Sequence, residues 1–102
     1  MQKSLFLFLC LFATLNSLAQ KVTLSGYVSD AKTGERLIAA TVYLPALQIG
    51  TRTNNYGFFS ITLDKQSEPR ELVVSYLGYS NSKDTLMLDQ SMSRDIRLKS
   101  TK

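Results

Sequence analysis

Apolar and polar residues alternate along the chain from residue 21 onward. Between residues 21 and 28 every second residue, from Val22 to Val28, is apolar or glycine. A period of two places these side chains on one buried face of a β-strand. Strand-forming residues return in six later segments, at residues 40–44, 49–53, 58–63, 72–77, 85–88 and 94–98. The pattern predicts seven short strands.

Turn-forming residues separate the predicted strands. Asp30–Glu35 carries Asp and Gly at turn positions, and Asn54–Gly57 is the strongest turn signal because Asn and Gly both tolerate a positive φ. Pro45 ends the second strand, since proline supplies no hydrogen-bond donor to a sheet. Residues 64–70 are polar and contain Pro69, which indicates a loop.

The most apolar run of this region is Leu72–Leu77. Its length and its β-branched residues predict a central strand that is buried on both faces. Gly78 then lets the chain bend. We expect the Tyr79 ring to pack on the edge of the core with its hydroxyl in water.

No segment after residue 20 has apolar residues at helical spacing over the length of a helix. Short strands with frequent turns predict an all-β fold, a seven-stranded antiparallel Greek-key β-sandwich. The predicted domain spans residues 20–98, and residues 99–102 form a basic tail or the start of a linker.

Residues 1–19 have the three parts of a signal peptide. Lys3 precedes an apolar run, Leu5–Ala13, and small residues at positions 17 and 19 precede Gln20. We expect cleavage after Ala19, which also removes Cys10. The alternative is a membrane anchor, but a spanning helix needs about 20 apolar residues and polar residues interrupt this run. We therefore predict an exported chain with no membrane span after cleavage.

Composition excludes most catalytic chemistry. The 102 residues include no His and a single Cys, so they lack the usual catalytic pairs and imidazole metal ligands. We expect no enzyme activity and no cofactor. Lys and Arg number 12 against 8 Asp and Glu, with part of the excess near the C-terminus. No basic stripe with interleaved aromatic residues indicates nucleic-acid binding.

The remaining candidate residues have structural or recognition roles. Gly26 indicates a bulge or a close backbone approach, and Gly57 a positive φ. The carboxylates of Asp30 and Glu35 are too few for a calcium site, and turn chemistry explains Asp30. Three serines, Ser25, Ser60 and Ser75, have no base to activate them. The tyrosines that fall outside the buried set are a possible interaction surface: Tyr27, Tyr43 and Tyr56.

Four stretches carry a family resemblance. They are Leu24–Asp30, Thr33–Leu44, Gly50-Thr51 with Thr53–Ile61, and Leu72–Tyr79. In this order they resemble the carboxypeptidase-regulatory-like domain (carboxypeptidase D regulatory-like), a transthyretin-like β-sandwich, in the version found at the front of Bacteroidetes outer-membrane receptors. The family often has Gly where Ala39 stands, which bears on a local bend.

The resemblance implies a non-catalytic periplasmic module. Such domains commonly precede the plug and barrel of TonB-dependent receptors of the SusC/RagA type, which import glycans and other nutrients. The predicted partners are therefore that plug and barrel, or other envelope proteins. Two hypotheses stay open: the chain is the front piece of such a receptor, or it is a free-standing periplasmic module that binds carbohydrate or protein.

Overall fold

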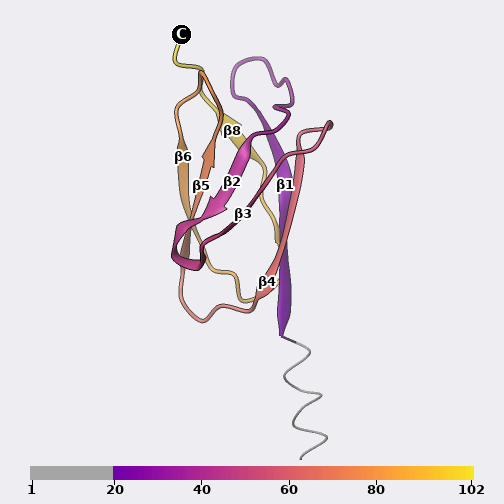
Figure 1. The fold of residues 1–102 in the computed structure, drawn as a ribbon, viewed down its shortest axis with the longest axis vertical. Helices are drawn as coiled ribbons and strands as arrows, with labels where there is room; N and C mark the ends of the chain where they lie inside the picture. Colours follow the sequence, from indigo (N-terminus) through magenta and orange to yellow (C-terminus); the bar gives the residue numbers. More distant parts are fainter. Residues whose placement is uncertain (1–19) are drawn as a thin grey trace, which may run out of the picture.

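The computed structural model describes residues 20–102, so the predicted signal peptide lies outside the described residues. Two β-sheets pack face to face (Figure 1). The elements, in chain order, are β1 (Lys21–Asp30), β2 (Thr41–Leu44), the 3₁₀ helix η1 (Pro45–Leu47), β3 (Ile49–Arg52), β4 (Phe58–Asp64), β5 (Arg70–Ser75), β6 (Ser82–Leu86), β7 (Met92–Ser93) and β8 (Ile96–Leu98). The all-β sandwich prediction is confirmed.

The first sheet is built around β1. Strand β4 pairs antiparallel with it along its length, from Lys21 opposite Asp64 to Tyr27 opposite Phe58. The short strands β7 and β8 lie along the other edge of β1 and run parallel to it. The second sheet has the order β3-β2-β5-β6, and all its pairs are antiparallel.

Two details of the prediction are wrong. The sandwich is not wholly antiparallel, because β7 and β8 run parallel to β1. Successive segments of the chain reverse direction, so the first and the seventh run the same way, and here they lie side by side. A further short strand, β7 (Met92–Ser93), precedes the predicted segment 94–98, which contains β8, and raises the strand number from the predicted seven to eight. Arg94 and Asp95 separate β7 from β8, and the Arg94 carbonyl lies against Gly26.

The core lies between the two sheets. Alternate residues along the strands are buried there, as their spacing predicts. The fully buried large side chains come from both sheets and from the loop after β6: Phe59, Leu24, Leu44, Leu72, Leu86, Leu88, Leu98, Val28, Val42 and Val74.

The prediction that residues 72–77 are buried on both faces is wrong. Leu72 and Val74 are buried, while Val73 and Ser75 on the outer face are only partly buried and Leu77 is 97% exposed. β5 is central within its sheet, since β2 and β6 flank it. No described element covers the outer face of that sheet, so only one face of β5 lies in the core.

Ala39 has a positive φ of 63°, in the region that favours glycine. Its N–H donates to the Thr53 carbonyl, and the Ala40 N–H donates to the Thr53 hydroxyl. These contacts fix the backbone where the family often has Gly. A left-handed conformation costs an L-residue roughly 1–2 kcal/mol.

We therefore expect Ala39→Gly to stabilise the fold. Glycine removes roughly 1–2 kcal/mol of strain and adds an entropic cost of roughly 0.5–1 kcal/mol, so the expected net gain is up to about 1.5 kcal/mol. Urea unfolding measures the change in the free energy of unfolding. Ala31→Gly, at another exposed position of the same loop but without a positive φ, is the control and gains nothing. Equal effects of the two substitutions contradict the prediction.

Three loops and the C-terminal segment gather at one end of the sandwich, opposite the end where β1 begins (Figure 1). We call this the loop end; it comprises residues 31–40, 53–57, 76–81 and 99–102. Backbone hydrogen bonds hold it together. The Ala31 N–H donates to the Leu98 carbonyl, the Ser80 N–H to the Lys99 carbonyl and the Thr101 N–H to the Gly78 carbonyl.

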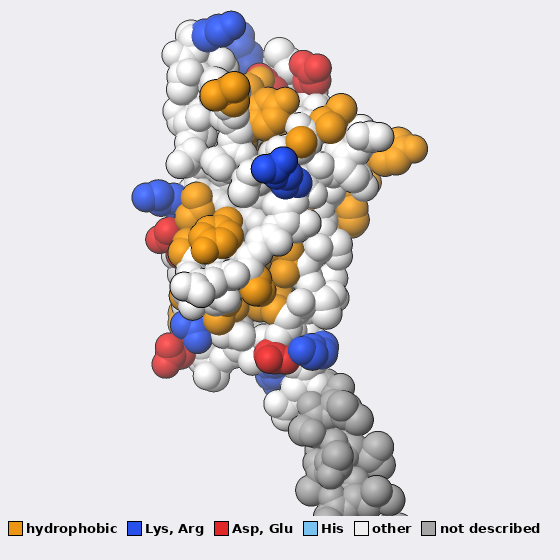
Figure 2. Space-filling view, in the orientation of Figure 1, with side chains coloured by type: hydrophobic (Ala, Val, Ile, Leu, Met, Phe, Trp, Pro, Cys, Tyr) orange, Lys and Arg blue, Asp and Glu red, His pale blue; other side chains and the backbone are white. Residues whose placement is uncertain are grey.

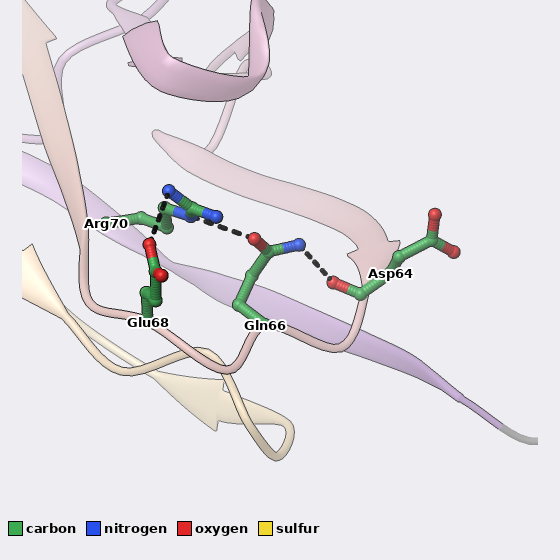
Figure 3. Close-up of polar contacts among 4 residues, drawn as sticks. All are labelled: Asp64, Gln66, Glu68 and Arg70. Carbon is green, nitrogen blue, oxygen red and sulfur yellow. Dashed lines mark hydrogen bonds and ion pairs between the residues drawn. The ribbon is translucent and has the colours of Figure 1, made fainter.

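The loop between β4 and β5 lies at the opposite end and is held by its own polar side chains (Figure 3). Arg70 Nε donates to Gln66 Oε1 over 2.8 Å, and Gln66 Nε2 donates to the Asp64 carbonyl over 2.8 Å. The Glu68 carboxylate lies 3.8 Å from Arg70 Nη1. These contacts give the predicted polar loop a defined shape without a ligand.

Candidate interaction surface and the Asp30–Tyr79 contact

Tyr27 lies on the outer face of β1 in a small aromatic cluster. Its ring meets the Phe58 ring edge to face, with centroids 5.2 Å apart. The Arg36 guanidinium carbon stacks 4.1 Å from the centroid of the Tyr27 ring. Arg36 is positioned by a bridge between its backbone and that of Ser29 at the end of β1. One face of Tyr27 is thus already occupied by a cation.

Tyr43 and Tyr56 lie elsewhere. Tyr43 is on the outer face of β2, in the other sheet, opposite Gly50, and is 39% exposed. Tyr56 is 76% exposed in the turn before β4, and its N–H donates to Asn54 Oδ1. The outer faces of two packed sheets point away from each other, so Tyr27 and Tyr43 do not share a surface. The three tyrosines therefore offer two separate faces, and their role in binding stays a prediction.

The glycines singled out by the sequence occupy constrained positions. A Cβ at Gly26 would lie 1.9 Å from the Arg94 carbonyl oxygen, so the backbone between β7 and β8 lies directly against this residue. Gly57 has a φ of 75°, and a Cβ there would lie 2.8 Å from Arg36 Cβ. Gly78 has a φ of 87° in the turn after β5.

The Asp30 carboxylate links the first turn to the turn after β5. Asp30 is buried, and its Oδ1 accepts from the N–H groups of Lys32 and Thr33 over 2.7 and 2.9 Å. Its Oδ2 accepts a 2.6 Å hydrogen bond from the Tyr79 hydroxyl. The hydroxyl, which we expect to lie in water, thus donates to a carboxylate of the same domain. Sequence spacing could not have found the pair, because the two residues are 49 positions apart.

The contact shifts both pKa values. The hydrogen bond from Tyr79, with those from the backbone of Thr33 and Lys32, lowers the pKa of Asp30 from 3.8 to about 2. The bond to Asp30, with burial, raises the pKa of Tyr79 from 10.0 to about 12. Each shift favours the protonation state that the hydrogen bond requires, a charged acceptor and a neutral donor.

The contact should therefore stabilise the fold between two pH limits. A lowered pKa of Asp30 gives stability that is present above about pH 4 and is lost as the pH falls toward 2. A raised pKa of Tyr79 gives stability that is present below pH 10 and is lost as the pH rises through about 12. Melting temperatures of the parent and Tyr79→Phe should differ most between these limits and converge beyond both.

Tyr76→Phe is the matched control for this measurement. The Tyr76 ring packs 5.5 Å from that of Tyr79, but its hydroxyl makes no hydrogen bond within residues 20–102. We expect Tyr76→Phe to follow the parent across the pH range. A constant difference between the parent and Tyr79→Phe at every pH contradicts the assignment.

The polar groups of the described chain do not form a reactive constellation. Ser25 and Ser60 face each other across β1 and β4, while Ser75 lies in the other sheet. Among residues 20–102, no three Cys, Asp or Glu side chains come together as metal ligands do. No helix in the same range is long and apolar enough to cross a bilayer.

Comparisons with known proteins agree with this architecture. One solved structure, a candidate membrane-associated protein of unknown function from Bacteroides fragilis, superposes with a TM-score of 0.60 and 26% sequence identity. The match covers 80% of this chain and 28% of that one, so the chain spans less than a third of the solved relative. No curated protein matches significantly.

The family assignment covers nearly all of the sandwich. The CarboxypepD_reg-like domain family matches residues 24–102, from the buried Leu24 of β1 to the C-terminal segment. Members of this family are regulatory, non-catalytic domains. The match includes each of the four stretches that carry the resemblance. The chain belongs to the CarboxypepD_reg-like domain family.

Proposed function

We propose that residues 20–98 form a non-catalytic periplasmic module, the N-terminal domain of a TonB-dependent outer-membrane receptor that imports a nutrient such as a glycan. The observation that carries the proposal is the match to 28% of a longer, candidate membrane-associated Bacteroides protein. A small domain within a longer membrane-associated chain is what a receptor's front module would be. The partners are then the plug and barrel of the same polypeptide.

The side chains support a non-catalytic role. The buried carboxylate, Asp30, accepts three hydrogen bonds within the fold and is held ionised by them. The chain has no His, and the hydroxyls of the candidate serines lie on strands without a base beside them. Export rests on the signal peptide predicted at residues 1–19, which delivers the domain to the periplasm.

Purification from native membranes tests this proposal. An antibody against residues 20–102 captures its antigen from detergent-solubilised outer membranes, and mass spectrometry identifies the peptides of the isolated polypeptide. We expect peptides from β1 to β8 together with peptides of a plug and barrel in one chain, with Gln20 as the first residue. Isolation of a polypeptide that contains no further sequence contradicts the receptor assignment.

A free-standing module that binds carbohydrate or protein is the second candidate. The observation that favours it is the aromatic cluster of Tyr27, Phe58 and Arg36, with the exposed Tyr56 on the adjoining turn. Since Tyr43 lies on the other sheet, it serves as the internal control. A glycan array should lose signal with Tyr27→Ala or Tyr56→Ala and keep it with Tyr43→Ala. No signal from the parent, or equal loss from all three variants, counts against this candidate.

A further inference from the structure

Three lysines converge at the loop end of the sandwich. Lys32, Lys99 and Lys102 line one hollow together with Ala31 and Ser100, and all three lysines are exposed. None of the three takes part in the ion pairs found among residues 20–102. Like charges held together without a partner attract an anion.

The charged residues around the three lysines add to the positive charge of the loop end. Arg36, Arg52 and Arg97 lie on or next to the loop end, and the exposed carboxylates there are Glu35 and Asp95. The buried Asp30 adds a third negative charge, which still leaves the basic residues of this end in excess. Of the other five acidic residues, Asp84 lies near the start of β6 and is ion-paired with Arg94, while Asp64, Glu68, Glu71 and Asp89 lie farther from this end. The positive excess of the chain is therefore concentrated at the loop end.

An exposed leucine lies in the turn that is hydrogen-bonded to the C-terminal segment. Leu77 is 97% exposed at the tip of a tight turn, which the Tyr79 N–H closes by donating to the Tyr76 carbonyl. The N–H and hydroxyl of Thr101 both donate to the Gly78 carbonyl, so this turn is fixed against the segment that carries Lys99 and Lys102. The Leu77 side chain therefore contributes almost nothing to the core described here.

Further apolar surface continues from Leu77. Ala39, Tyr76 and Leu77 line a shallow hollow with Arg52, and the neighbouring Ile38 is 48% exposed. Figure 2 shows hydrophobic side chains at this end together with basic and acidic ones, on the face that carries β2 and β3. The loop end thus presents apolar tips among lysines and arginines.

We propose that the loop end docks on an anionic lipid surface, with Leu77 inserted among the lipids and the three lysines on the headgroup phosphates. Apolar side chains that enter the interface beside basic residues are the mark of peripheral membrane binding. A protein partner fits less well, because the cores of protein interfaces are depleted in lysine.

Vesicle binding by residues 20–102, which contain both sheets and the whole described core, tests the proposal. The probe is sedimentation with vesicles of equal parts phosphatidylglycerol and phosphatidylethanolamine, compared with phosphatidylcholine vesicles. We expect binding to the anionic vesicles only, weakened by added salt. Leu77→Ser should weaken it about tenfold or more. Replacing Lys32, Lys99 and Lys102 by Gln should weaken it by roughly fivefold per lysine.

Matched variants remove the same groups from other parts of the surface. Met87→Ser removes an exposed apolar side chain away from the loop end, and Gln at Lys21 and Lys65, near the end where β1 begins, removes two of the same charges. Both should bind as the parent does, and circular dichroism verifies that every variant is folded. Absence of binding by the folded parent, or equal losses in test and control variants, overturns the proposal. If the domain does not bind lipid, and a photo-crosslinker at position 77 captures a protein in cells, the loop end binds a protein partner instead.

Discussion

Val74→Asp should abolish the cooperative thermal transition of the domain. Val74 is 1% exposed on the inner face of β5, between Val42 of β2 and Ser82 of β6. An unpaired carboxylate at such a position costs several kcal/mol. A small domain has about 5 kcal/mol of stability at the low end of the usual range, so little or none should remain. The measurement is a thermal melt followed by circular dichroism.

Val73→Asp is the matched control for Val74→Asp. It makes the same substitution one residue earlier, on the outer face of β5 and in register with Lys83. The carboxylate there stays in contact with water, so we expect a cooperative melt close to that of the parent. Equal melts of the two variants would refute the placement of the core between the sheets.

Gly26→Ala should have the second largest effect. The added Cβ would lie 1.9 Å from the Arg94 carbonyl oxygen and 2.6 Å from the Arg94 carbonyl carbon, so the backbone of the edge segment must move. That movement pulls on the hydrogen bond from the Arg94 N–H to the Ser25 carbonyl. Overpacking costs typically 1–3 kcal/mol, and a backbone clash belongs at the upper end of that range. We expect the melting temperature to fall by roughly 12–24 °C.

Ser25→Ala introduces the same side chain at the preceding position and is the control for Gly26→Ala. Ser25 is only partly buried, and its backbone carbonyl still accepts from Arg94. Its melting temperature should stay close to that of the parent. If Gly26→Ala and Ser25→Ala have the same melting temperature, the segment that contains Arg94 does not lie against β1 as described.

Local pattern was enough to predict most of the fold. The alternation around Val22 and Leu24 identified the inner face of β1, because a strand turns every second side chain toward the core. Gly26 indicated a bulge or close backbone approach from its place within a strand. The sequence also indicated a positive φ at Gly57. Each of these features depends on neighbouring residues alone.

Features that depend on tertiary neighbours were missed or wrongly predicted. The apolar run at Leu72–Leu77 could not reveal that no described layer covers the outer face of β5. Thr53 gave no signal, yet its buried hydroxyl donates to the Leu37 carbonyl and accepts from the Ala40 N–H. The parallel pairing of β7 and β8 with β1 follows from which strands become neighbours, and a period of two does not contain that information.

The candidate site was harder to predict than the fold. Alternation predicts the exposure of Tyr43, and the turn at Asn54–Gly57 predicts that of Tyr56, but whether tyrosines gather depends on which sheet each strand joins. The contact from Tyr79 to Asp30 joins two turns that are distant in the sequence. The lysine hollow likewise combines Lys32 from the first loop with Lys99 and Lys102 from the last segment. Such groupings arise only once the loops meet at one end.

The size of the native protein tests the receptor assignment most directly. An antibody raised against residues 20–102 is used to blot outer-membrane and periplasmic fractions of the native cells. The assignment predicts a band in the outer membrane several times larger than the 11.4 kDa chain. A soluble periplasmic band at the size of residues 20–102 would contradict it and would favour a free-standing module.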